Sequence, residues 1–157
     1  SMLIEAMLPH GVAAMMEFQT ENKNRVFGDV RSIVQRAGGS LSPTAFLFEK
    51  KGRVWFEPHE TIGVDEAMDE AIEAGAEEIA AEEEKLVVDT TPELVTAVSQ
   101  HLESSLGLKT ERTEILYDPN PETQVKLDES QATDLQTVLD AIEDMDDLQE
   151  LYINALD

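Results

Sequence analysis

The chain has 157 residues, which is enough for one ordinary domain or two small ones. Its hydrophobic fraction of 41% can form a core, and its formal net charge of −23 opposes general attraction to nucleic acid. The absence of cysteine excludes disulfides, thiolate metal sites and cysteine nucleophiles. No apolar run approaches the roughly 20 residues that span a bilayer, so we expect no membrane partner.

The first third of the chain predicts a strand, a helix and a second strand. Residues 12–20 are rich in Val, Ala, Met and Phe and favour a buried strand. The apolar residues of 23–37 fall on one side of a helix, which Asn22 caps and Gly38 ends. Residues 44–50 have the alternation of side chains that is typical of a strand, with Phe46 and Phe48 on one face, so we predict a second strand there.

The middle of the chain predicts six consecutive elements after a turn at Lys51-Gly52. They are a strand, a helix, a hairpin of two strands, a helix and a strand. Their expected ranges are 53–56, 64–74, 77–81, 86–89, 92–107 and 109–117.

The run Asp118-Pro119-Asn120-Pro121 is the strongest break in the sequence. Beyond it we predict a short strand over residues 124–127. A helix over 129–143 follows, beginning at Asp128 with the pattern of a capping box. The last predicted element is a strand over residues 148–154.

This element order predicts an α+β fold of two ferredoxin-like domains, one inserted into the other. The middle elements run β-α-β-β-α-β, and the outer pieces together supply the same set. We predict an outer domain, 2–51 and 122–157, that carries a basic face, and an acidic inserted domain, 52–121. A single larger α+β domain is the alternative.

Basic residues gather near the start of the chain. Seven of the eleven lysines and arginines lie between Lys23 and Arg53, against two acids, so this window is +5 and the remainder −28. We predict that these seven residues bind RNA phosphate. They are Lys23, Arg25, Arg31, Arg36, Lys50, Lys51 and Arg53. Chance clustering of solvated surface charges is the alternative.

No pattern in the sequence indicates catalysis or a cofactor. The three histidines, His10, His59 and His101, each stand alone, so no metal site is expected. Residues 144–147 resemble part of a calcium loop but lack its glycine and its last glutamate. Neither Gly-x-Ser-x-Gly nor a phosphate loop is present. We therefore expect a protein that is not an enzyme.

Several stretches resemble conserved blocks of the YebC family, in family order and over nearly the whole chain. These stretches are Gly11-Val12-Ala13, Thr20-Glu21-Asn22-Lys23-Asn24-Arg25, Asp29-Val30-Arg31, Phe46-Leu47-Phe48-Glu49-Lys50-Lys51-Gly52, Glu73-Ala74-Gly75-Ala76-Glu77-Glu78, Thr91-Pro92-Glu93 and residues 141–152. Two further segments resemble the mitochondrial branch, which includes the translational activator of cytochrome c oxidase. They are Leu8-Pro9-His10-Gly11, where bacterial members are glycine-rich, and Ser42-Pro43-Thr44-Ala45-Phe46.

The resemblance implies a three-domain protein with two α+β domains. We expect this chain to lack the family's lysine-rich N-terminal helical domain. The implied function is that of a monomeric, ribosome-associated translational activator that contacts ribosomal RNA or mRNA. Its implied location is the mitochondrial matrix, with the cytoplasm as the alternative. Some bacterial members resemble DNA-binding transcription regulators, which is a second hypothesis. A third is an acidic module that docks a basic ribosomal protein.

Overall fold

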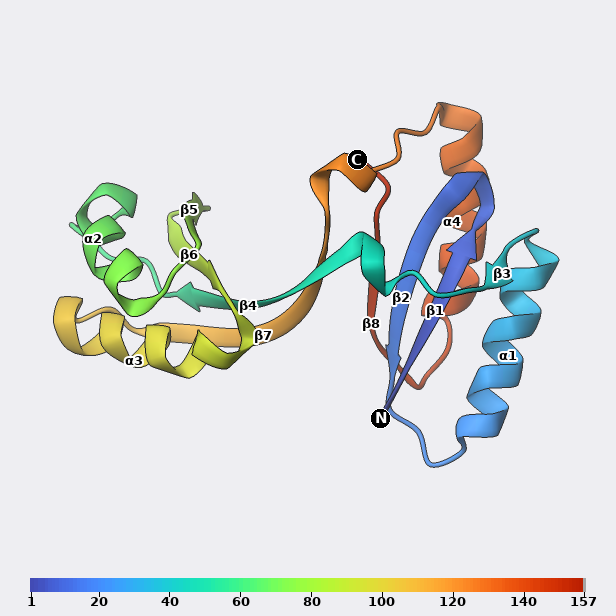
Figure 1. The fold of residues 1–157 in the computed structure, drawn as a ribbon, viewed down its shortest axis with the longest axis horizontal. Coiled ribbons are helices and arrows are strands. Elements are labelled where there is room, and N and C mark those ends of the chain that lie inside the picture. Colours follow the sequence, from blue (N-terminus) through green and yellow to red (C-terminus); the bar gives the residue numbers. More distant parts are fainter. Residues whose placement is uncertain (157) are drawn as a thin grey trace. The chain divides into compact units, whose positions relative to one another are not determined.

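The chain folds into two compact units in a computed structural model that describes residues 1–156. Asp157, the last residue of the predicted outer domain, lies outside the described residues. Unit 1 holds Ser1–Glu49 and the segment from Tyr117 onward, and unit 2 holds Lys50–Leu116. Within residues 1–156, each unit has one four-stranded sheet and two α-helices (Figure 1). The predicted α+β class with two ferredoxin-like domains is confirmed.

The sheet of unit 1 has the strand order β3-β1-β2-β8. Its elements are β1 (Met2–Leu8), β2 (Val12–Phe18), α1 (Lys23–Arg36), β3 (Ser40–Leu41), α4 (Glu129–Glu143) and β8 (Leu148–Ile153). The central pair, β1 and β2, is an antiparallel hairpin in which Met2 lies opposite Phe18. A short 3-10 turn, Pro9–Gly11, joins the two strands.

The two faces of the unit 1 sheet are both covered. Every second residue of β2 lies in the core shared with α1 and α4: Val12, Ala14, Met16 and Phe18. The alternate residues Ala13 and Met15 pack against Phe48 on the other face. There the rings of Tyr117 and Tyr152 meet edge to face, with centroids 5.5 Å apart.

Strand β1 was not predicted from the sequence. Strand β1 buries Ile4, Ala6 and Leu8 on one face, but Leu3 and Met7 on its less buried face are apolar too, so the sequence shows no clear two-residue period. Its one acid, Glu5, accepts hydrogen bonds from the backbone N–H groups of Thr44 and Ala45, at 2.8 and 2.7 Å. With β1, the sheet of unit 1 has its four strands.

Two other strands predicted for unit 1 do not form as expected. Residues 45–47 of the strand predicted over 44–50 form a 3-10 turn, and the strand that begins at Phe48 is β4, which belongs to the sheet of unit 2. The sheet of unit 1 contains β3 instead. Residues 124–127 contribute a single bridge between Val125 and Ala155.

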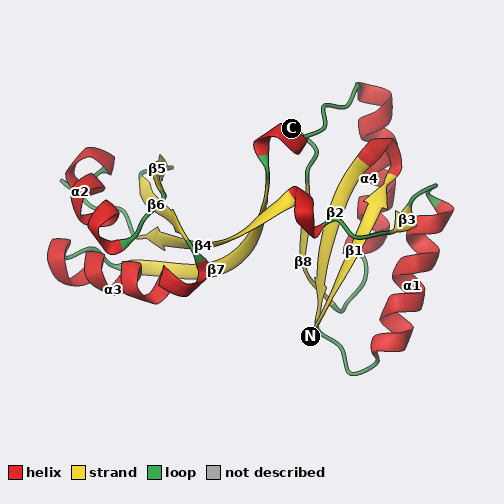
Figure 2. Cartoon of the chain, viewed as in Figure 1, coloured by secondary structure: helices red, strands yellow, loops and turns green. Residues whose placement is uncertain are grey.

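The elements of unit 2 follow the predicted order β-α-β-β-α-β. They are β4 (Phe48–Phe56), α2 (Val64–Ala74), β5 (Glu78–Glu82), β6 (Lys85–Thr90), α3 (Val95–Leu106) and β7 (Thr110–Pro119). The sheet order is β5-β6-β4-β7, which places the first strand between the third and the fourth. Helices α2 and α3 lie side by side (Figure 2) and share a core with β4 and β6.

The predicted turn at Lys51-Gly52 is wrong, because both residues lie inside the continuous strand β4. Gly52 is needed for close packing: a Cβ atom there would lie 1.9 Å from Cγ2 of Val95, at the start of α3. The contacts divide the chain between Glu49 and Lys50 and between Leu116 and Tyr117, so both divisions fall within strands β4 and β7.

None of the helices in residues 1–156 combines the length and the apolar character that crossing a bilayer requires.

Candidate nucleic-acid interface

Four of the seven predicted phosphate-binding residues lie on α1 of unit 1. The helix begins where Asn22 Oδ1 accepts a hydrogen bond from the backbone N–H of Arg25, at 3.1 Å. Its apolar side is buried by three valines at helical spacing: Val26, Val30 and Val34. The basic residues are all exposed: Lys23, Arg25, Arg31 and Arg36. Burial of the valines therefore directs these cations to solvent.

Arg25 is held by two carboxylates. Its Nη1 lies 3.3 Å from Asp29 Oδ2, one turn along α1, and its Nη2 donates to Asp147, just before β8. The hydrogen bond and the charge of Asp147 raise the pKa of Arg25 above its ordinary value, and Asp29 adds to this effect. Arg25 thus links α1 to the start of β8, and its charge is already compensated within unit 1.

For the other three cations of α1, residues 1–156 supply no such partner. Among the residues that the structure describes, no carboxylate pairs with Lys23, Arg31 or Arg36. We call these three residues the α1 cations. They are the part of the predicted site that geometry leaves available to an external anion.

The remaining three predicted residues lie on β4 in unit 2. Lys50 is exposed and Lys51 is half-buried. Arg53 makes a bidentate ion pair with the buried Asp89 on β6, from Nε to Oδ1 at 2.5 Å and from Nη2 to Oδ2 at 2.8 Å. This geometry fits a structural cross-strand pair. The prediction of one continuous basic face joins residues of both units, and it stays a prediction.

The acidic charge is shared evenly between the units. Unit 1 has five basic and 17 acidic residues, a net charge of −12, and unit 2 has six and 17, a net charge of −11. Unit 1 is thus acidic as a whole, although it carries the α1 cations. Any attraction to phosphate has to be local, because the charge of either unit repels a polyanion at long range.

The sequence analysis did not predict the cation–π contacts of Trp55 in unit 2. The guanidinium carbon of Arg112 lies 3.6 Å from the ring centroid of Trp55, and that of Arg53 lies 5.8 Å away. Trp55 is 9% exposed, and the guanidinium of Arg112 contributes to covering its ring. The alternation of Arg53 and Trp55 on β4 was a visible signal that they share a face, but nothing local pointed to Arg112 on β7.

A second feature is a groove in unit 1 beside the Pro9–Gly11 turn. It has a volume of about 520 Å³ and is lined by Pro9, His10, Ile33, Arg36, Ala37, Asp134, Thr137, Val138 and Ala141. His10 has left-handed backbone angles, φ 66° and ψ 25°, which a non-glycine residue rarely adopts. Its Nε2 lies 2.9 Å from Asp134 Oδ2 on α4. This contact holds the turn against α4 at the same edge as Arg36.

The chain is a protein of two α+β units, one of which carries a helix with exposed cations. Comparison with known proteins shows which family has this architecture. The family described as "TACO1/YebC second and third domain" matches residues 1–155. The chain belongs to the TACO1/YebC family.

The relatives of the chain are consistent with this assignment. A probable transcriptional regulatory protein of Clostridium perfringens is 41% identical over 158 residues, covering 99% of this chain and 63% of that protein. One of the same description from Rubrobacter xylanophilus is 39% identical over 153 residues, covering 96% and 60%. A crystal structure of a conserved hypothetical protein from Aquifex aeolicus is similar with a TM-score of 0.77 and 33% identity, covering 99% of this chain and 64% of that one. The chain therefore spans less than two thirds of the length of each of these relatives.

Proposed function

We propose that the protein containing this chain is a monomeric translational activator that binds the ribosome through RNA and protein contacts. The observation that carries this proposal is the set of α1 cations on a unit whose net charge is −12. A ribosome offers a mixed surface of RNA phosphate and cationic ribosomal proteins. An acidic body with a small cationic strip is complementary to such a surface, whereas duplex DNA presents phosphate alone.

Within this proposal, the α1 cations contact ribosomal RNA or mRNA phosphate. Contacts of this kind fix position and orientation but do not read sequence. Lys50 and Lys51 are further candidates in unit 2. Arg25 and Arg53 act structurally, because their carboxylate partners occupy them. The acidic surfaces of both units face ribosomal protein. No catalytic step and no cofactor is part of the proposal.

The decisive comparison uses two charge reversals that change net charge equally. In the full-length protein, Arg31→Glu with Arg36→Glu should weaken ribosome co-sedimentation by about tenfold or more, because two phosphate contacts become repulsions. Lys109→Glu with Lys126→Glu is the matched control, since both lysines are exposed and lie outside α1. Its binding should stay close to that of the wild type.

Either of two results would contradict the proposed role of α1. Equal losses in both double variants would mean that only total charge matters. Unchanged co-sedimentation of the α1 variant would remove this face from the function. Salt titration adds a separate readout, because the slope of log affinity against log salt should fall by roughly 0.7 for each lost contact to single-stranded RNA.

The proposed site of action is the mitochondrial matrix. The segments Leu8-Pro9-His10-Gly11 and Ser42-Pro43-Thr44-Ala45-Phe46 support it by their resemblance to the mitochondrial branch. The full-length protein should co-fractionate with mitochondrial ribosomes when cells are separated into organelle and cytosol. Recovery with cytosolic ribosomes alone would favour the cytoplasmic alternative.

A DNA-binding transcription regulator is the second candidate, favoured by the printed description of the bacterial relatives. Titrating the full-length protein against ribosomes and against duplex DNA at one fixed physiological salt concentration separates the two functions. The translational proposal expects the ribosome to bind much more tightly. Tighter binding to a defined DNA sequence than to ribosomes would favour the regulator.

A further inference from the structure

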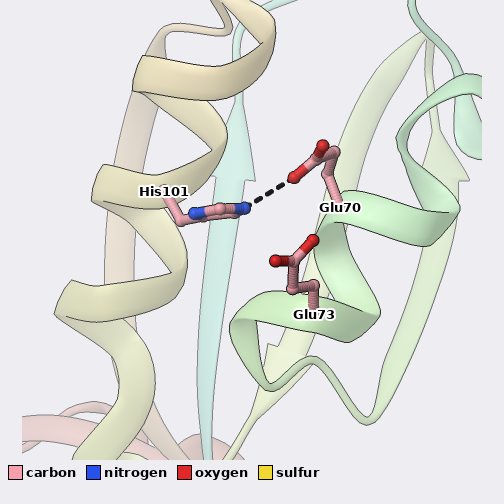
Figure 3. Close-up of side chains that lie close together, drawn as sticks. All are labelled: Glu70, Glu73 and His101. Carbon is pink, nitrogen blue, oxygen red and sulfur yellow. Dashed lines mark hydrogen bonds and ion pairs between the residues drawn. The ribbon is translucent and has the colours of Figure 1, made fainter.

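One histidine and two glutamates converge between the helices of unit 2 (Figure 3). Glu70 and Glu73 are three residues apart on α2, so their side chains leave the same side of that helix. His101 comes from α3, which packs beside α2. Each residue offers one ligand atom, and these three atoms all lie within 4.8 Å of one another. Figure 3 shows the three side chains directed into the space between the helices.

We propose that Glu70, Glu73 and His101 form a binding site for a divalent transition-metal ion, with Zn²⁺ as the best match. Zn²⁺ accepts imidazole nitrogen together with carboxylate oxygen, whereas Mg²⁺ and Ca²⁺ prefer oxygen ligands alone. Three protein ligands leave a fourth tetrahedral position for water.

The observed geometry requires only side-chain adjustment. Metal–ligand bonds of about 2.0–2.2 Å place tetrahedral ligand atoms roughly 3.4 Å apart. At present, His101 Nε2 and Glu70 Oε2 are hydrogen-bonded at 2.7 Å, so the ion would replace the shared proton and widen this gap. The two side chains are 35% and 37% exposed, which gives them room to move and gives the ion a path from solvent.

The electrostatic surroundings favour a cation at this position. Unit 2 has a net charge of −11. Over residues 1–156, no lysine or arginine pairs with Glu70 or Glu73, so both carboxylates can turn to an ion.

The sequence analysis expected no metal site because His101 stands alone in the sequence. The spacing of residues along the chain does not show that α2 and α3 pack side by side.

Binding would fasten α2 to α3. Both helices lie on the same face of the unit 2 sheet and share its core, so an ion across them would crosslink the layer that packs on β4 and β6. An ion that binds only the folded state stabilises it, and the stabilisation grows with the logarithm of the free ion concentration once that exceeds the Kd. The site would therefore have a structural role that is independent of ribosome binding.

Isothermal titration of the chelator-treated chain with Zn²⁺, near neutral pH and at physiological salt, tests the site directly. We expect one saturable site per chain and a rise in melting temperature with Zn²⁺. Glu73→Gln should weaken binding about tenfold or more, because a ligand is lost. Glu73 is exposed, so this variant should fold normally. His101→Ala should have at least as large an effect.

The matched control is Asp69→Asn, which removes one exposed negative charge from the same helix without touching the cluster. Its affinity for Zn²⁺ should remain that of the wild type. Co²⁺ supplies a second readout, because three protein ligands and water should give the intense visible absorption of a tetrahedral ion, and His101→Ala should abolish it. The proposal fails if Zn²⁺ does not saturate, if binding is spread over several weak sites that salt removes, or if Glu73→Gln and His101→Ala bind like the wild type.

Discussion

Replacing Gly52 with alanine is expected to destabilise unit 2 by about 3 kcal/mol. The new Cβ would lie 1.9 Å from Cγ2 of Val95 and 3.0 Å from the backbone oxygen of Thr91. The strand β4 and the start of α3 would have to separate, because one of these two neighbours is backbone and cannot rotate away. Urea unfolding of the chain, followed by the fluorescence of Trp55, measures the loss.

The matched control for this substitution is Gly28→Ala. Gly28 lies within α1, and nothing lies within 4 Å of an added Cβ there, so alanine should stabilise unit 1 by about 1 kcal/mol. A second test adds Val95→Ala to Gly52→Ala, which removes the clashing methyl group. The double variant should be more stable than the sum of the two single effects predicts. Unchanged stability in Gly52→Ala would show that the packing at β4 is looser than described.

Gly52 also shows where sequence reasoning succeeded and where it failed. The apolar pattern of unit 2 predicted all of its helices and strands, although β6 is buried at almost every residue and β5 is mostly exposed. A Lys-Gly pair between two apolar segments is typical of a turn, but this glycine serves close packing inside a strand. In unit 1 the same reasoning missed β1, because the apolar Leu3 and Met7 on its less buried face hide the alternation in the sequence.

The candidate site was predicted only in part, for a related reason. Sequence counts place cations in a window but do not reveal their partners. Asp147 lies 122 residues from Arg25, and Asp89 lies 36 residues from Arg53, so both ion pairs depend on the tertiary fold. The helical period did predict that Arg36 faces solvent. His101 lies 31 residues from Glu70, so their contact is likewise not visible in the sequence.

The ion pair of Arg53 and Asp89 leads to the second large expected effect. Asp89→Ala should destabilise unit 2 by about 3 kcal/mol, because it leaves a partly buried guanidinium without its bidentate partner. The side chains of Asp89 and Arg53 are only 10% and 25% exposed. Glu111→Ala is the matched control, since its pair with Lys85 is more exposed, at 31% and 36%, and should contribute less than about 1 kcal/mol.

The role of Arg53 can then be separated from a phosphate contact. Arg53→Met combined with Asp89→Leu replaces the pair by apolar side chains, and its stability should recover toward the wild type, because neither partner is left charged and buried. Ribosome co-sedimentation of this double variant, measured on folded full-length protein, should match the wild type while Arg31→Glu with Arg36→Glu loses binding. If instead the apolar pair is stable and yet fails to bind ribosomes, Arg53 contacts RNA as the sequence analysis predicted, and the interface includes β4 of unit 2.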